Sequence, residues 1–192
     1  MLVLVASGWA CLVIAIAVAP ARVREVCAKE GACELVSHVV LAVAMLAFAA
    51  AAVRARGHTK PRPGALALVA VLAGIVLGEE LDWGGLGNVH NAAGGHSYAL
   101  FALAAPVLAA VALGRGSWAV AWRERLGPWA PTRGDGAAAL VVAAVALASA
   151  LVPWPWESEV DEVAELLGYA VLTGVALRGH ASASGLSSST QS

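Results

Sequence analysis

The sequence has few charged residues for its length. Of its 192 residues, 13% are charged and 60% are hydrophobic, and the mean hydropathy is +0.77. Water-soluble domains carry about 25% charged and about 45–50% apolar residues, so this composition excludes an ordinary soluble domain, a disordered chain and a coiled coil. An excess of positive charge is also missing, with 12 basic and 13 acidic residues, which argues against nucleic-acid binding. The composition predicts an integral membrane protein.

Six apolar stretches are long enough to cross a bilayer core, which takes roughly 20 helical residues. They cover residues 2–20, 34–53, 63–82, 96–114, 136–154 and 158–177. The predicted fold is therefore all-α, a polytopic membrane helix bundle with six transmembrane helices that form a single domain over residues 1–180. Ala19-Pro20-Ala21 resembles a signal-peptide cleavage site, and cleavage there would leave five helices. An uncleaved span is favoured, because the first ten residues contain no Lys or Arg.

Basic residues predict the orientation of the bundle. Nine of the twelve fall on one side of the predicted spans: Arg54, Arg56, Lys60, Arg62, Arg115, Arg123, Arg125, Arg133 and Arg178. By the positive-inside rule this side is the cytoplasm, which predicts a multi-pass protein of the cell membrane with both termini in the cytoplasm. The remaining three, Arg22, Arg24 and Lys29, lie in the first outer loop.

The segment between the fourth and fifth spans mixes aromatic and basic residues. Trp118 and Trp122 are four residues apart and therefore share one helical face, and Trp129 follows among arginines. This pattern predicts a short helix lying in the cytoplasmic interface, where it anchors the bundle. The uncharged, Ser-rich residues 181–192 are predicted to form a disordered tail.

Acidic residues gather on the outer side, where eleven of the thirteen fall. Counting back from the basic ends of the second and sixth spans places Glu165 about 10 Å, and Glu162 and His38 about 6 Å, inside the outer boundary. Each such group costs ~3 kcal/mol in hydrocarbon and by default faces the bundle interior or a water-filled cavity. The sequence therefore predicts a polar cavity near the outer surface. The alternative is a sixth span that starts later and leaves its acids in a solvated loop.

Spacing supports convergence of these groups. Residues three or four apart share one face of a helix. The outer ends of three spans each carry such a pair: Glu34 with His38, Glu79 with Asp82, and Glu162 with Glu165.

A distinctive string ends the third span, Gly78-Glu79-Glu80-Leu81-Asp82-Trp83-Gly84, followed by Asn88-Val89-His90-Asn91. It resembles the "GEEISWGQ…LHN" signature of a family of uncharacterised bacterial integral membrane proteins. The similarity covers roughly residues 30–103 and 157–177. Asp82 stands in place of the usual Ser and Gly85 in place of Gln, and the loop before His90 is shorter. The resemblance implies a membrane location and the place of a site, but no activity.

Carboxylates and imidazoles from several helices are the ligand set of Zn²⁺, Mn²⁺ or a di-iron pair. We expect a divalent metal ion, whose identity the sequence leaves open. The predicted ligands are Glu34, His38, Glu79, Glu80, His90, His96 and Glu162. Asp82 and Glu165 are the predicted catalytic bases.

These residues suggest a metal-dependent membrane enzyme, a hydrolase or oxidoreductase acting on a lipid-like substrate within the bilayer. A proton- or cation-coupled small transporter is one alternative, and a non-catalytic membrane subunit or assembly factor is another. A haem-b electron carrier would need His38 and His96 as axial ligands and ranks last. Cys27 and Cys33, in the first outer loop, are predicted either to pair in an oxidising compartment or to remain inert thiols.

Overall fold

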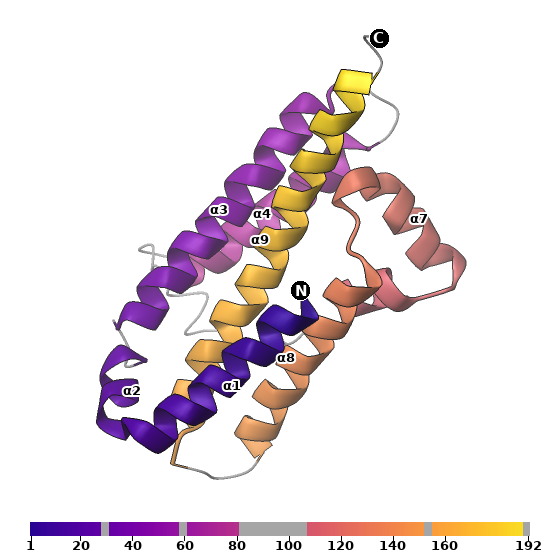
Figure 1. The fold of residues 1–192 in the computed structure, drawn as a ribbon. Coiled ribbons are helices and arrows are strands. Elements are labelled where there is room, and N and C mark those ends of the chain that lie inside the picture. Colours follow the sequence, from indigo (N-terminus) through magenta and orange to yellow (C-terminus); the bar gives the residue numbers. More distant parts are fainter. Residues whose placement is uncertain (28–30, 58–60, 81–106, 152–154, 190–192) are drawn as a thin grey trace.

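A computed structural model of the chain describes residues 1–27, 31–57, 61–80, 107–151 and 155–189. These residues contain helices and no strand, which confirms the predicted all-α class for this part of the chain (Figure 1). A short helix also covers residues 107–113. The main elements are α1 (Leu2–Val18), α2 (Pro20–Val26), α3 (Ala32–Arg54), α4 (Pro63–Glu80), α7 (Ser117–Leu126), the 3₁₀ helix η1 (Gly127–Trp129), α8 (Arg133–Leu151) and α9 (Glu157–Ser189).

Helices α3 and α9 lie side by side and run in the same direction. Thr173 Oγ1 donates a hydrogen bond to the carbonyl oxygen of Val40 at 2.9 Å, and His180 Nε2 donates one to the carbonyl oxygen of Ala47 at 2.8 Å. The two contacts are seven residues apart on each helix, which is about two helical turns. The same register therefore holds along both helices, and their N-termini lie at one end of the bundle.

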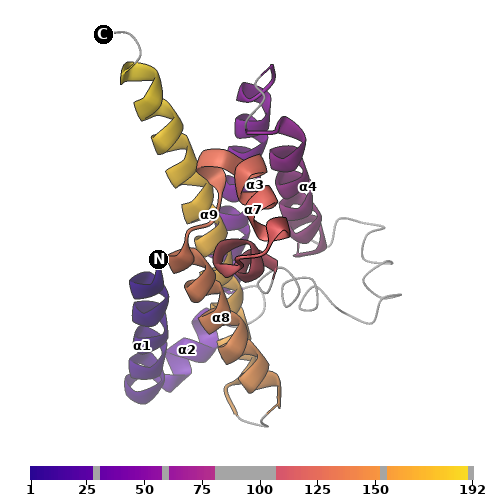
Figure 2. The same cartoon turned by 90° about the vertical axis from the view of Figure 1, so that its right-hand side faces the viewer.

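The helices α1, α4 and α8 run in the opposite direction. Met1 packs against Gly174 and Gly8 against Leu167, so α1 is antiparallel to α9. Helix α4 returns along α3, where a Cβ atom at Gly74 would lie 3.1 Å from the sulfur of Met45. Two views show α1 and α8 flanking one half of α9, with α3 and α4 beside the other half (Figures 1 and 2).

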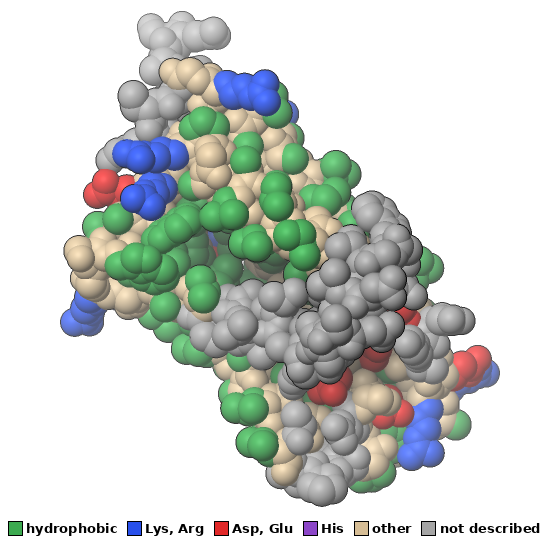
Figure 3. All heavy atoms as spheres, turned by 180° about the vertical axis from the view of Figure 1, so that it is seen from behind, with side chains coloured by type: hydrophobic (Ala, Val, Ile, Leu, Met, Phe, Trp, Pro, Cys, Tyr) green, Lys and Arg blue, Asp and Glu red, His purple; other side chains and the backbone are tan. Residues whose placement is uncertain are grey.

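Small and aliphatic side chains fill the contacts between these helices. Leu41, Leu66 and Val142 are at most 1% exposed, and buried alanines occur on α3, α4, α8 and α9. Small residues let helix backbones approach closely, as they do in membrane bundles. Large aliphatic side chains also cover the outer surface, with Val3 79% and Leu35 66% exposed, and Figure 3 shows hydrophobic side chains over much of one face.

Helix α3 is the one described helix that is both long and apolar enough to cross a membrane by itself. Two apolar helices are shorter, Leu2–Val18 and Pro63–Gly78, and the pair Ser117–Trp129 and Arg133–Ser149 qualifies only as a span bent by 105°. The structure thus places a helix at five of the six predicted spans. The remaining span, residues 96–114, lies largely outside the described residues, so the six-span topology stays a prediction.

Two local features differ from the sequence-based expectation. Helix α9 continues to Ser189, whereas a disordered tail was expected from residue 181. Trp129 is only 4% exposed and packs against His180 with the ring centroids 5.4 Å apart, so it belongs to the core and not to an interfacial anchor.

The short helix predicted between the fourth and fifth spans is present as α7 and η1. Gly127, with φ of +57°, ends α7 in the left-handed conformation that favours glycine.

Asp135 links the start of α8 to α9. Its carboxylate accepts hydrogen bonds from the backbone N–H and the hydroxyl of Thr132, which cap the helix, and from both terminal guanidinium nitrogens of Arg178. Asp135 is 1% exposed. Burial opposes ionisation, but the hydrogen bonds from Arg178 and Thr132 outweigh it and hold the pKa of Asp135 below its usual range. Both members of this ion pair lie just beyond the predicted spans.

We expect Asp135→Ala to lower the free energy of unfolding by about 2 kcal/mol. The variant loses a helix cap worth ~1 kcal/mol and leaves Arg178 without its buried partner, although partial exposure of Arg178 limits that loss. Because the folded-state pKa is lowered, the contribution is present at neutral pH and is lost as the pH falls through that pKa. Unfolding of both proteins in detergent at a series of pH values measures this difference in the free energy of unfolding. The control is Glu124→Ala, an exposed acid of α7; an equal loss in both variants would contradict the prediction.

Candidate functional site

Acidic residues gather at the N-terminal ends of the packed helices α3 and α9, a region we call the acidic end. It contains Glu34 and His38 from α3, and Glu159, Glu162 and Glu165 from α9. In the register of the two helices Glu165 is level with Ala32, so it lies about 3 Å along the axis from Glu34. In Figure 3, acidic side chains gather toward the lower end of the visible face, and several Lys and Arg side chains lie toward the upper end. Helices α3 and α9 thus each bring acidic residues to this end of the bundle.

Glu34 and His38 share one face of α3, as their spacing predicts. Glu34 Oε1 and His38 Nε2 are 4.0 Å apart, which is longer than a hydrogen bond but within the range of an ion pair when the imidazole is protonated. The two side chains are 17% and 15% exposed. A carboxylate and an imidazole are therefore held near each other in a largely enclosed place.

Helix α4 brings further acids to the same end. Because α4 is antiparallel to α3 and Gly74 lies against Met45, the backbone of Glu79 and Glu80 is level with Val39 and Val40. These two residues end α4, within about 3 Å along the axis of the level of His38. The described backbone thus supports a three-helix site, to which α3, α4 and α9 each contribute acidic residues.

Arg24 from α2 also reaches the acidic end. Its Nε lies 3.8 Å from Oε1 of Glu159, and its guanidinium carbon lies 4.6 Å from the ring centroid of Trp156. Glu159 is only 7% exposed, so this ion pair compensates a buried charge. Sequence reasoning missed Glu159 as a distinct member of the cluster, because nothing in its local pattern separates it from its acidic neighbours. The other arginine of α2, Arg22, is bound to Glu25 at 2.8 Å.

Cys27, at the end of α2, and Cys33, in the first turn of α3, lie next to each other. Their sulfur atoms are 3.0 Å apart, and both are free thiols. The hydrogen bond to Cys33, burial, and the negative charges of Glu162 and Glu159 all raise the pKa of the Cys27 thiol. The two thiols thus share a hydrogen bond in which either sulfur can be the donor. The electrostatic effect of Glu162 also shows that the acids of α9 lie near this pair.

The predicted site residues divide into two groups. Glu34, His38, Glu162 and Glu165 lie at the acidic end on packed helices. The side chains of Glu79 and Glu80, and all of Asp82, His90 and His96, lie outside what the structure describes. Within its described part, the chain has no group of three or more His, Cys, Asp or Glu side chains arranged to hold a metal ion. The predicted metal site therefore depends on α4 and on the residues that follow it.

Comparisons with protein-family models, with curated proteins and with solved structures find no match for this chain. The resemblance based on the Gly78–Gly84 string thus stays a prediction. The residues of the acidic end and their geometry are what support a function.

We expect oxidised glutathione to join Cys27 and Cys33. One thiolate attacks the glutathione disulfide and releases a first glutathione thiol; the second cysteine then attacks the mixed disulfide and releases another. Two protein thiols are oxidised and one glutathione disulfide is reduced. Peptide mass spectrometry should show the cross-link, and the free energy of unfolding should rise by about 2 kcal/mol. In the Cys27→Ser control the reaction should stop at a Cys33–glutathione adduct. Adducts that persist on both cysteines of the unmodified sequence would contradict the prediction.

Proposed function

We propose that the chain is a multi-pass membrane protein with both termini on the cytoplasmic side. In a six-span topology, odd-numbered spans run against even-numbered ones. Helices α1, α4 and α8 correspond to the first, third and fifth predicted spans. They run antiparallel to α3 and α9, which correspond to the second and sixth, so the observed directions fit this rule. Arg54 and Arg178 lie toward the C-terminal ends of α3 and α9, so the positive-inside rule assigns that end to the cytoplasm. The exposed aliphatic side chains then contact lipid.

The bend between α7 and α8 supports the same placement. Helix α7 and η1 turn by 105° relative to α8, so α7 lies across the end of the bundle. Trp118 is 52% exposed, and Arg123 holds α7 to the preceding segment by hydrogen bonds to the carbonyl oxygens of Ala112 and Gly114. A helix across the bundle end with an exposed Trp is suited to the membrane interface.

Fusions to a topology reporter test the orientation. A phosphatase that is active only outside the cytoplasm should be inactive when it is fused after Ser192, because α9 runs inward. The matched fusion after Leu151, where α8 ends at the outer side, should be active. A fluorescent protein that matures only in the cytoplasm should give the reverse pattern. Phosphatase activity at Ser192 would overturn the proposed orientation.

We propose further that the acidic end binds a divalent cation. The observation that carries this proposal is the register of α3 and α9, which sets Glu165 within about 3 Å along the axis of Glu34, whose carboxylate lies 4.0 Å from His38. Carboxylates held together repel one another, and the two arginines of α2 are already bound to Glu25 and Glu159. A cation shared by α3, α4 and α9 would relieve this repulsion.

A metal-dependent reaction on a lipid-like substrate fits the position of this site. The acids lie within the first turns of α3 and α9, a depth at which the polar group of a lipid meets the bilayer. A bound cation would polarise such a substrate or activate water. Glu165, and Asp82 beyond the end of α4, are the residues we propose as general bases. Glu34, His38, Glu79, Glu80, His90, His96 and Glu162 are the proposed ligands.

Metal analysis and chelation test the proposed site. We expect a stoichiometric divalent metal in the purified protein and a lower melting temperature after chelator treatment. Glu34→Gln and His38→Ala should each abolish the effect of chelator, because each removes a ligand. The matched control is Glu25→Gln, which alters an exposed acid at the same end and should leave the effect intact. If chelator changes no melting temperature and no metal copurifies, the acids serve proton movement or helix packing and the enzyme proposal fails.

A further inference from the structure

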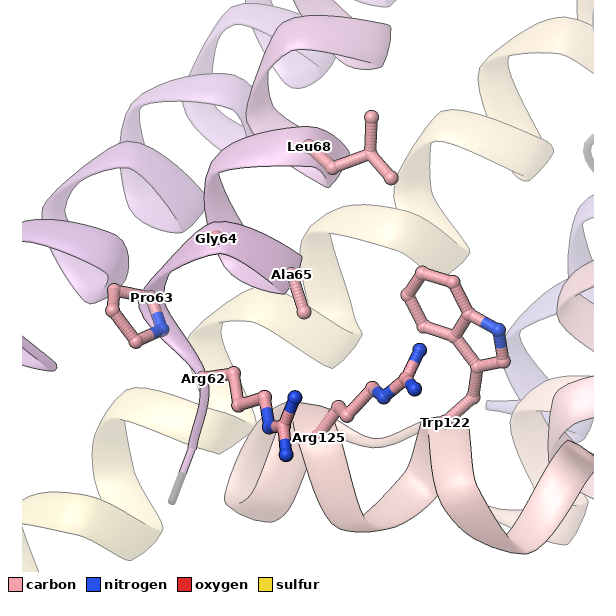
Figure 4. Close-up of a pocket in the computed structure, with 7 residues that line it drawn as sticks. All are labelled: Arg62, Pro63, Gly64, Ala65, Leu68, Trp122 and Arg125. Atoms are coloured by element: carbon pink, nitrogen blue, oxygen red, sulfur yellow. The ribbon is translucent and has the colours of Figure 1, made fainter. Parts of the chain in front are cut away.

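A pocket of about 520 Å³ lies between the start of α4 and the helix α7, at the opposite end of the bundle from the acidic end (Figure 4). Its walls combine two arginines with apolar side chains and with the first turn of α4. The lining residues are Arg62, Pro63, Gly64, Ala65, Leu68, Trp122 and Arg125.

The walls of this pocket are held by backbone contacts. The N–H of Arg62 donates a hydrogen bond to the carbonyl oxygen of Arg125 at 2.8 Å, which ties α7 to the start of α4. A Cβ atom at Gly127 would lie 3.3 Å from the Cβ atom of Pro61, so the two segments pack closely there. Leu126 is 7% exposed and anchors the end of α7 in the core. The backbones of the two arginines therefore occupy a fixed relative position, from which both exposed side chains extend.

Positive charge dominates the mouth of the pocket. Figure 4 shows the side chains of Arg62 and Arg125 extending near each other, with Trp122 beside them. The guanidinium carbon of Arg125 is 5.5 Å from the ring centroid of Trp122. No ion pair joins either arginine to a carboxylate in the described part of the chain. The positive end of the α4 macrodipole adds to this field, so the mouth is suited to an anion.

An exposed apolar stripe leads from this mouth along α4. Leu68 lines the pocket and is 46% exposed, and Leu72 and Ile75 follow at 53% and 43%. The spacing of four and then three residues places all three on one face of the helix. A ligand that complements both features has an anionic head and a long apolar tail.

We infer that this pocket binds the phosphate of an anionic phospholipid, whose acyl chain lies along Leu68, Leu72 and Ile75. The site is separate from the proposed cation site and rests only on the proposed membrane location, which places the start of α4 at the cytoplasmic leaflet. A soluble phosphate would complement the arginines but would make no use of the apolar stripe that continues from them. The stripe and the charged mouth together therefore favour a lipid.

Lipid titration followed by native mass spectrometry tests this inference on the full chain in neutral detergent. We expect saturable binding of phosphatidylglycerol, binding of phosphatidylcholine with the same acyl chains that is at least about tenfold weaker, and no competition by inorganic phosphate. The double variant Arg62→Gln/Arg125→Gln should bind phosphatidylglycerol about 30-fold more weakly, because two charges near the headgroup are removed. The matched control is Arg56→Gln, an exposed arginine at the same end outside the pocket, which should bind normally.

Other outcomes overturn the inference in distinct ways. Competition by inorganic phosphate would indicate a site for soluble anions, and an equal loss in Arg56→Gln would indicate diffuse attraction to basic residues. Undiminished binding in the double variant would place the lipid elsewhere. If the double variant does not fold, Leu68→Ser replaces it and should weaken binding of long-chain but not short-chain phosphatidylglycerol. Metal content measured in the same samples tests the proposed cation site independently. Loss of lipid binding with metal still bound would therefore contradict this inference alone.

Discussion

The parallel packing of α3 against α9 is the constraint on which the rest of the structure depends. Two side chains of α9, Thr173 and His180, donate hydrogen bonds to carbonyl oxygens of α3 two turns apart. Both contacts use acceptors that already belong to a helix, so they fix the register without breaking the backbone ladder. Once the register is fixed, the position of every charged residue on one helix relative to the other follows. Acids meet at one end, and Arg54 and Arg178 lie toward the other.

Contacts near Arg54 and Arg178, away from the acidic end, extend this constraint to α7 and α8. His180 accepts a hydrogen bond from Arg54 at Nδ1, at 3.1 Å, and its ring lies edge-on to Trp129 of η1. Arg178 holds Asp135 at the start of α8. Arg178 and His180, two residues apart on α9, thus position α8 and η1 respectively. Because η1 follows α7 directly, its position also determines the position of α7. The pocket beside α4 therefore depends on a helix that does not line it.

Sequence reasoning located the long helices but not the contacts between them. Long runs of apolar residues predict α1, α3, α4, α8 and α9. Such a run forms a helix with a continuous apolar surface, and its length can be read directly from the sequence. The shared helix face of Glu34 and His38 was also predictable, because it follows from their spacing of four residues. The ion pairs Arg24–Glu159 and Asp135–Arg178 join residues far apart in the sequence, and no local pattern records which partner a buried charge meets. The same holds for the packing of Trp129, whose basic surroundings suggest an interface.

Helix α4 gives the two proposed sites a common electrostatic basis. Its N-terminus forms part of the pocket with Arg62, and its C-terminus ends in Glu79 and Glu80 at the acidic end. Its 18 residues span about 27 Å, close to the thickness of a bilayer core. A helix carries partial positive charge at its N-terminus and partial negative charge at its C-terminus. An anion at the first end and a cation at the second are each favoured by this one dipole. In the proposed membrane location these interactions would be screened less than in water, so the direction of α4 would add to the effect of the side chains at its ends.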